Sequence, residues 1–234
     1  FDHPMALQAL GIRPIWVPFE AASSGQPDVD AIAARITAKT RAILLVTPSN
    51  PTGAVTAPET LHQLYALARQ HDIALLLDET YNAFLPAGSP PHALFAEPDW
   101  QRHFIQIASF GKTFALTGYR AGALVAGPDL LHQALKVQDT MAVCQPRITQ
   151  QAIRFGCEHL DDWVAENAVM MQRRHDLFEK LFNRPGNSFQ LLASGGFFAW
   201  VKHPWAQLSS RDAARRLLEE GHLLCLPGEA FGPG

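Results

Sequence analysis

Short apolar runs alternate with amphipathic segments through the first two thirds of the chain. Five runs dominated by apolar residues are typical of buried strands: residues 12–18, 42–47, 73–78, 104–109 and 120–127. Two segments between them, residues 28–37 and 58–72, carry apolar residues three and four positions apart, which is typical of amphipathic helices. Continuous apolar strands separated by helices indicate a parallel sheet that helices cover on both faces. The pattern therefore predicts an α/β fold with a mostly parallel sheet.

The hydrophobic pattern changes twice in the rest of the chain. Helical spacing dominates three consecutive segments: residues 128–141, 149–160 and 160–184. A turn-forming stretch follows. After it, the β-prone segments 189–203 and 223–227 lie on either side of a predicted helix at residues 210–222. We therefore divide the chain into three parts: a large domain (1–160), a linking helix (161–183) and the start of a small α+β domain (184–234).

The composition is that of an ordinary globular protein. The chain has 234 residues, of which 47% are apolar and 18% are charged. A formal net charge of −3 without a lysine-rich run gives no basic surface for nucleic acid, and no apolar run is long enough to span a membrane. We therefore expect neither nucleic acid nor a membrane as a partner.

Cysteine and histidine show no pattern typical of a metal site. The three cysteines lie far apart without a C-x-x-C, and the ten histidines include no H-E-x-x-H. Isolated cysteines favour a reducing compartment, so we expect a cytoplasmic protein without a metal. The chain begins with Phe1 and stops at Gly234 among turn-forming residues, so we expect an internal piece of a longer protein.

The segment 104–120, FIQIASFGKTFALTGYR, carries a lysine that fits three kinds of site. Lys112 within GKT suggests a phosphate-binding P-loop, but Gln106 stands where that motif requires its first glycine. Ser109 and Lys112 also form the S-x-x-K of serine acylases, but the companion motifs of those enzymes are missing. In the third kind of site, Ser109, Lys112 and Arg120 hold an aldehyde cofactor that carries a phosphate.

Two further motifs follow predicted strands. SNPTG at residues 49–53 follows the run 42–47, and DETY at residues 78–81 begins at the end of the run 73–78. Ligands of open parallel sheets bind at the carboxyl ends of the strands, so both motifs should face the same crevice as Lys112. Three separate segments are therefore expected to converge on one site.

In order and approximate spacing, these motifs resemble the fingerprint of the fold-type I, pyridoxal-phosphate-dependent aminotransferases of class I/II. The resemblance rests on four stretches: Asn50-Pro51-Thr52-Gly53, Asp78 with Tyr81, Ser109 with Lys112, and Thr117-Gly118-Tyr119-Arg120. It extends to SGGFFAWV and LPGEAFG near the end of the chain. It implies that residues 1–160 form the incomplete cofactor-binding large domain of that fold, with a seven-stranded-type, mostly parallel sheet flanked by helices.

The resemblance implies pyridoxal 5′-phosphate as the cofactor and Lys112, Asp78 and Tyr81 as catalytic residues. Lys112 is expected to form the internal aldimine and, once the substrate amine displaces it, to move the proton between the substrate Cα and the cofactor C4′. Asp78 is expected to keep the pyridine nitrogen protonated, so that the ring accepts charge from the substrate. Tyr81 and Asn50 are expected to donate hydrogen bonds to the phenolic oxygen of the cofactor.

The other implied cofactor-binding residues are Ser109 and Arg120, which would hold the phosphate as a hydroxyl donor and a planar cation. The resemblance also implies a cis peptide bond between Asn50 and Pro51. Each residue has an ordinary structural alternative, such as an ion pair for Arg120 or a turn for Ser109 and Asn50. The motifs together favour the cofactor site.

The implied function is amino-group transfer between an L-amino acid and a 2-oxo acid by a homodimer. A C–S lyase or synthase of the same fold would need the same Lys112 and Asp78, and the effector domain of a transcription regulator is a further alternative. Gly195 and Gly196 fit either a backbone approach to the substrate or a tight turn. The arginine that binds the substrate carboxylate and the tyrosine from the partner subunit are expected outside this chain. Phe1 stands close to where the aromatic residue stacked on the cofactor would fall.

Overall fold

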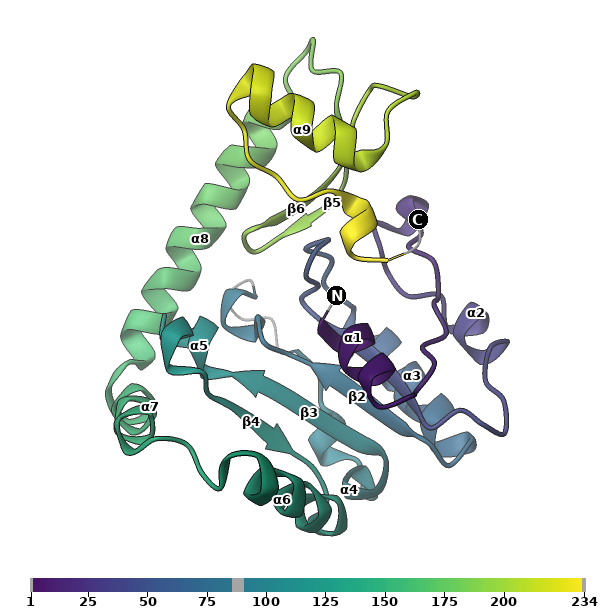
Figure 1. Cartoon of the computed structure of the whole chain (residues 1–234), viewed down its shortest axis with the longest axis vertical. Helices are drawn as coiled ribbons and strands as arrows, with labels where there is room; N and C mark the ends of the chain where they lie inside the picture. The colour runs from purple at the N-terminus through teal and green to yellow at the C-terminus, as the bar shows by residue number, and fades with distance from the viewer. Residues whose placement is uncertain (1, 86–90, 233–234) are drawn as a thin grey trace.

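The computed structural model describes residues 2–85 and 91–232. Within them, four strands form one sheet in the order β1-β2-β3-β4 (Figure 1): β1 Ala42–Val46, β2 Ala74–Asp78, β3 Phe104–Ser109 and β4 Gly122–Val125. The pairs β1–β2 and β2–β3 are parallel, whereas β4 runs antiparallel to β3. The predicted α/β fold with a mostly parallel sheet is confirmed.

Helices connect and flank the strands of this sheet. They are α1 Asp2–Ala9, α2 Val29–Ala33, α3 Pro58–Gln70, α4 Trp100–His103, α5 Phe110–Thr113, α6 Pro128–Ala142 and α7 Arg147–His159. Short 3₁₀ turns lie at η1 Ala21–Ser23, η2 Asn82–Phe84, η3 Leu94–Ala96 and η4 Thr117–Tyr119. The four helices predicted in this part of the chain correspond to α2, α3, α6 and α7, and α2 is shorter than predicted.

The main hydrophobic core lies between α3 and the sheet. Pro58 stands in the first turn of α3, where its missing amide hydrogen is not needed. The buried face of this helix supplies four residues: Leu61, Leu64, Tyr65 and Ala68. Leu75 and Leu77 of β2 are fully buried in the same core, and each contributes about 1.5–3 kcal/mol. Because side chains alternate along a strand, Asp78 faces the opposite, half-buried side of the sheet.

A long helix, α8 Asp161–Phe182, leads from α7 to a second and smaller group of elements (Figure 1). That group contains the antiparallel pair β5 Gln190–Gly195 and β6 Phe198–Lys202, followed by α9 Ser210–Gly221 and η5 Gly228–Ala230. Ser209 caps α9, since its Oγ accepts a hydrogen bond from the Asp212 backbone N at 3.1 Å. The helix α8 lies where the linking helix is predicted, and the division into domains stays a prediction.

Two of the predicted strands are wrong. Residues 12–18 and 223–227 have no regular secondary structure, and no described strand pairs with either segment. Pro14 and Pro18 lack the amide hydrogens that a strand needs for pairing. In the second segment Leu224 is 78% exposed, so it lacks the packing that stabilises a buried strand. An apolar run forms a strand only where a neighbour exchanges hydrogen bonds with it.

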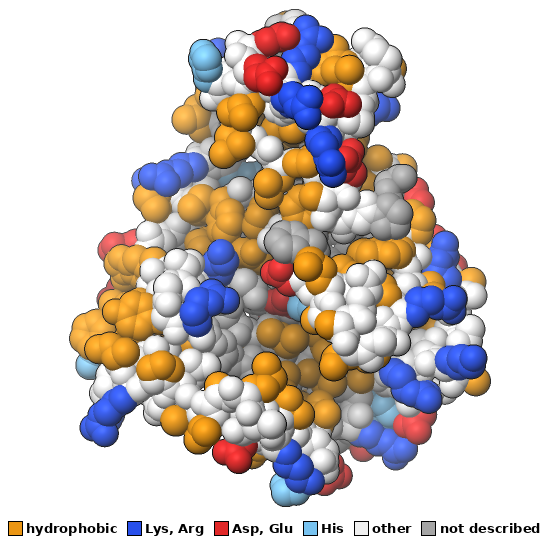
Figure 2. Space-filling model, in the orientation of Figure 1, with side chains coloured by type: hydrophobic (Ala, Val, Ile, Leu, Met, Phe, Trp, Pro, Cys, Tyr) orange, Lys and Arg blue, Asp and Glu red, His pale blue; other side chains and the backbone are white. Residues whose placement is uncertain are grey.

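The surface carries apolar side chains over α6 and α7, as the space-filling view shows (Figure 2). The exposed large residues of these helices include Leu135, Met141, Ile148 and Phe155. Across the residues that the structure describes, no helix combines the length and the apolar character needed to cross a membrane.

Candidate active site

The strand ends bring the predicted site segments to one edge of the sheet. Asp78 pairs with Val46 at the end of β1 and lies beside the last residues of β3, so the segments that follow these three strands leave at the same edge. Because β4 is antiparallel and its Gly122 pairs with Ser109, the loop that ends at Arg120 returns to that edge. The sheet therefore brings together three segments that lie far apart in the sequence: those that follow β1, β2 and β3.

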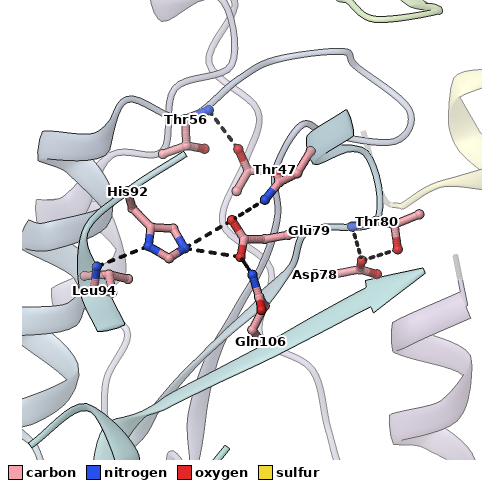
Figure 3. A network of polar contacts seen from close by, with 9 residues as sticks. Thr47, Thr56, Asp78, Glu79, Thr80, His92, Leu94 and Gln106 are labelled. Atoms are coloured by element: carbon pink, nitrogen blue, oxygen red, sulfur yellow. Dashed lines mark hydrogen bonds and ion pairs between the residues drawn. The ribbon is translucent and has the colours of Figure 1, made fainter. Parts of the chain in front are cut away.

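Asp78 is a carboxylate held by three hydrogen bonds. Its Oδ2 lies 2.7 Å from His3 Nε2. Its Oδ1 accepts hydrogen bonds from the Thr80 backbone N at 3.1 Å and Oγ1 at 2.6 Å (Figure 3). Burial alone would raise the pKa of Asp78, but the hydrogen bonds from His3 and Thr80 outweigh it and hold that pKa below its ordinary value. The side chain is therefore an anion at neutral pH.

Tyr81 and Asn50 are joined by a hydrogen bond, in which Asn50 Nδ2 donates to Tyr81 Oη at 3.2 Å. The buried Tyr81 ring meets Phe197 and Phe198 edge-on, with ring centroids 5.5 and 5.0 Å away. Burial raises the pKa of Tyr81, so the phenol keeps its proton at neutral pH and can donate it to a further acceptor. The Asn50–Pro51 peptide bond is cis, as predicted.

A contact between two glycine backbones fixes the loop that carries Asn50. Gly53 has φ +76°, and a β-carbon there would collide with the backbone of Gly195. A β-carbon on Gly195 would in turn collide with the Gly53 carbonyl oxygen. Gly196 has φ +55° and forms the turn between β5 and β6. The backbone of Gly195 therefore approaches the loop that carries Asn50, and Gly196 provides the positive φ of a tight turn.

Lys112 lies on the short helix α5, directly after β3, and is half-buried. Ser109 ends β3, and its carbonyl oxygen accepts a hydrogen bond from Thr113 Oγ1 at 3.2 Å. The ring of Phe114 packs on α7 at Gly156, where a β-carbon would overlap the ring. The segment that carries Lys112 is therefore anchored to the sheet at one end and to α7 at the other.

Arg120 ends this loop in the left-handed conformation, with φ 53°. Its side chain is exposed, and its Nη1 donates to the Thr117 carbonyl oxygen at 3.0 Å. The neighbouring Tyr119 carbonyl oxygen accepts a hydrogen bond from Thr149 Oγ1 at 3.2 Å, and Thr149 is buried on α7. The helix α7 thus also holds the end of the loop from which Arg120 projects.

His3 contacts the site, and no sequence motif predicts this. It lies on α1, 75 positions before its partner Asp78. It is one of ten histidines, and no local motif distinguishes it from the others. The sequence alone therefore offers no signal for this contact.

The side-chain chemistry at this edge fits pyridoxal phosphate. The groups present are an anion, two neutral donors, a primary amine, a hydroxyl and a guanidinium: Asp78, Asn50, Tyr81, Lys112, Ser109 and Arg120. The anion suits a pyridine nitrogen, and the two neutral donors suit a phenolic oxygen. The amine suits an aldehyde, and the hydroxyl and the guanidinium suit a phosphate. An ionised carboxylate has about four acceptor sites, so Asp78 can accept one more hydrogen bond beside those from His3 and Thr80. Among the described residues, no cluster of His, Cys, Asp and Glu is suited to hold a metal.

Comparisons with curated proteins point to one family. The chain is 34% identical to the putative aminotransferase YugH of Bacillus subtilis, over 86% of this chain and 51% of the relative. It is 30% identical to aromatic-amino-acid aminotransferase 2 of Thermococcus litoralis, over 99% of this chain and 60% of the relative. The chain thus spans about half to three-fifths of the length of these relatives.

Solved structures agree with this assignment. The aspartate aminotransferase of Thermus thermophilus with maleate matches 98% of this chain and 60% of its own, at 26% identity and a TM-score of 0.88. The aromatic aminotransferase of Pyrococcus horikoshii matches 94% of this chain and 60% of its own, at 27% identity and a TM-score of 0.86. The family described as aminotransferase class I and II matches residues 2–233, and the chain therefore belongs to it.

Proposed function

We propose that the protein containing this chain is an aminotransferase that moves an amino group between an L-amino acid and a 2-oxo acid. Members of the family use pyridoxal 5′-phosphate. The observation that carries the proposal is the set of strand-end segments with complementary chemistry at one edge of the sheet. When bound, the cofactor supplies a protonated ring that accepts the negative charge developing on the substrate Cα.

Asp78 is the proposed partner of the pyridine nitrogen. A carboxylate with a lowered pKa stays charged throughout the neutral range, so it can keep that nitrogen protonated. Tyr81 and Asn50 are the proposed donors to the phenolic oxygen, since the raised pKa of Tyr81 keeps its proton in place. Asn50 already holds the Tyr81 hydroxyl by a hydrogen bond, which supports a shared role.

Lys112 is the proposed covalent attachment point and the base. Its primary amine would hold the cofactor at the aldehyde carbon, with loss of water. When a substrate amine takes that place, the freed Lys112 amine would hold the proton that leaves the substrate Cα. Ser109 and Arg120 are the proposed phosphate ligands, because a hydroxyl and a planar cation both donate to phosphate oxygens.

We further propose that the full-length protein is a cytoplasmic homodimer. The exposed apolar side chains of α6 and α7 support an interface on that side of the molecule (Figure 2). The three cysteines Cys144, Cys157 and Cys225 are free thiols, which supports a reducing compartment.

Borohydride fixation tests the role of Lys112. Full-length protein loaded with pyridoxal phosphate is reduced and digested, and mass spectrometry should find the cofactor on the peptide that contains Lys112. Lys112→Ala should lose fixation and at least about 10²–10⁴-fold of the turnover, the usual contribution of a general base. Lys136→Ala, at an exposed lysine of α6, is the matched control and should behave as the wild type. Fixation on another lysine would contradict the assignment.

Product analysis separates transamination from the alternatives. A transaminase converts the amino acid only when a 2-oxo acid acceptor is present, and it releases no ammonia. A C–S lyase of the same fold would release ammonia without an acceptor. A regulator domain would bind the cofactor without turnover, and either result would overturn the proposed activity.

A further inference from the structure

A second carboxylate, Glu79, is buried directly beside Asp78 and has no part in the proposed chemistry. It is the first residue after β2, and its side chain is fully buried. Its backbone N donates to the Ile107 carbonyl oxygen at 2.8 Å, which ties it to β3. Burying a charge costs free energy unless hydrogen-bond donors surround it, so donors are expected around the Glu79 carboxylate.

Three side chains donate hydrogen bonds to Glu79 (Figure 3). His92 Nε2 lies 3.2 Å from both carboxylate oxygens, and Asn82 Nδ2 donates to Oε1 at 2.9 Å. Gln106 Nε2 on β3 donates to Oε2. Burial alone would raise the pKa of Glu79, but the hydrogen bonds from His92, Asn82 and Gln106 outweigh it and lower that pKa. Glu79 is therefore an acceptor for donors from three separate segments.

His92 is itself held in one orientation. Its Nδ1 accepts a hydrogen bond from the Leu94 backbone N at 3.2 Å, so in the neutral ring the hydrogen lies on Nε2 and points to Glu79. The ring meets Phe104 edge-on, with centroids 5.2 Å apart, and its side chain is 2% exposed. The pair His92–Glu79 is thus fixed by packing on one side and hydrogen bonds on the other.

The turn after β2 separates two sets of side chains. Asp78 and Thr80 lie on one side of it, whereas Glu79, His92 and Gln106 lie together on the other (Figure 3). Glu79 also precedes Tyr81 by two residues, and the Asn82 backbone N donates to the Glu79 carbonyl oxygen at 3.1 Å. Whatever holds Glu79 therefore holds the backbone from which both Asp78 and Tyr81 project.

We propose that Glu79 is a positioning residue, which with His92 and Gln106 fixes the direction in which Asp78 and Tyr81 face the cofactor. The inference rests on the proposed function. The charge is essential to this role, because all three neighbours donate and only a carboxylate accepts on both oxygens. Glutamine has nearly the same shape, but its NH₂ group would face the NH₂ group of Gln106 in one orientation and that of Asn82 in the other.

The test compares Glu79→Gln with the wild type in full-length protein loaded with pyridoxal phosphate. The turnover number should fall about tenfold or more with little change in KM, since misplaced groups lose alignment in the transition state. Weaker donation by Tyr81 should make the phenolic oxygen more basic. The pH midpoint of the visible absorption of the bound cofactor should therefore rise by about 0.5 unit or more.

Two further variants separate positioning from loss of stability. Glu79→Gln with Gln106→Glu exchanges donor and acceptor across the pair, and it should restore the absorption midpoint and most of the turnover. Leu61→Ala in the core under α3 should lower the melting temperature without moving the midpoint. If Glu79→Gln does not fold, Gln106→Met removes a single donor and should move the midpoint in the same direction by less.

The outcomes distinguish this inference from the proposed function. A wild type that binds cofactor and transaminates, together with Glu79→Gln or Gln106→Met at an unchanged midpoint and turnover, would overturn the positioning role alone. A wild type without cofactor absorption or turnover would overturn both. A shift in Glu79→Gln that the exchanged pair does not reverse would also contradict the proposal.

Discussion

Asp78 shows how neighbouring residues decide the charge of one side chain. Desolvation favours the neutral acid, whereas hydrogen bonds from His3 and Thr80 favour the anion, and the anion prevails. The pyridine nitrogen of the proposed cofactor stays protonated only beside an anion. His3 therefore supports the proposed chemistry without touching the reacting atoms.

Replacing His3 by alanine should destabilise the folded protein at neutral pH more than at acid pH. The folded-state pKa of Asp78 is depressed, so its contribution to stability is present above the ordinary pKa of 3.8 and is lost as the pH falls through the lower folded-state value. A hydrogen bond to a charged group is worth about 1.5–3 kcal/mol. We expect the lower end of that range at pH 7, because His3 is partly exposed.

Thermal unfolding of the cofactor-free protein at pH 7, 5 and 3 measures this effect. The difference in melting temperature between His3→Ala and the wild type should shrink once the pH falls below about 3.8, the ordinary pKa of an aspartate. His3→Gln, which keeps a side-chain N–H, should lose less. An equal deficit at all three pH values would show that His3 acts only through packing.

The residues of the site differ in how far the sequence reveals them. Asp78 ends one apolar run and Lys112 follows another by three residues, so the parallel direction of the strands determines the edge that they reach. His3 and His92 contact partners 75 and 13 positions away, and no local period encodes such pairs. The edge of the sheet at which the motif residues lie was therefore predictable, and the contacts of His3 and His92 were not.

At the scale of elements, the loop 49–53 and the β5–β6 pair touch through their backbones. The Thr56 backbone N donates to Thr47 Oγ1 at 3.0 Å and fixes the far end of the same loop. The contact between Gly53 and Gly195 leaves no room for a side chain on either residue. The position of Asn50 thus depends on an element that lies far along the chain.

Gly195→Ala should force these two elements apart. The added β-carbon would overlap the Gly53 carbonyl group, and overpacking of this kind costs about 1–3 kcal/mol. The loop that carries Asn50 should move, so we expect weaker cofactor binding as well as a lower melting temperature. Gly221→Ala is the matched control, because a β-carbon there meets nothing within 4 Å at the end of α9. Equal stability of the two variants would contradict the account of this contact.

The hydrophobic pattern alone did not determine which apolar runs form strands. The runs 42–47 and 73–78 became strands because each lies beside another strand and under α3. The runs 12–18 and 223–227 are also rich in apolar residues, but the first contains Pro14 and Pro18, and no described strand lies beside either run. An apolar run indicates that a segment is buried. Whether it forms a strand depends also on a pairing strand, which the hydrophobic pattern of the run does not identify.

At the scale of the whole molecule, α8 is connected to the β5–β6 pair by a small polar cluster. Ser194 Oγ donates to Glu179 Oε1 at 2.6 Å, and His175 Nε2 lies 3.2 Å from the same oxygen. Ser194 directly precedes Gly195, which contacts the loop of Asn50. The cluster therefore links α8, the smaller group of elements and one part of the site.

Ser194→Ala should loosen this connection. Loss of a hydrogen bond to a carboxylate costs about 1.5–3 kcal/mol when the pair is partly buried. Amide hydrogen exchange should become faster in β5 and unchanged in α3. Ser210→Ala removes an exposed bond of the same type, from Ser210 Oγ to Glu229 Oε2 at 2.9 Å, together with the bond from the Glu229 backbone N at 3.1 Å. Because both lie away from β5 on the surface, exchange in β5 should change less than in Ser194→Ala. Unchanged exchange in β5 would show that packing alone holds the pair.

The antiparallel strand β4 also bears on the order in which the site assembles during folding. Because β4 begins at the edge where β3 ends, the short loop between the two strands holds Ser109, Lys112 and Arg120 at that edge. The other half of the site requires closure of longer loops, such as the one between His3 and Asp78. Closing a longer loop costs more chain entropy, so contacts of high sequence separation form later. The loop that carries Lys112 can therefore reach its native shape before the contact between His3 and Asp78 forms.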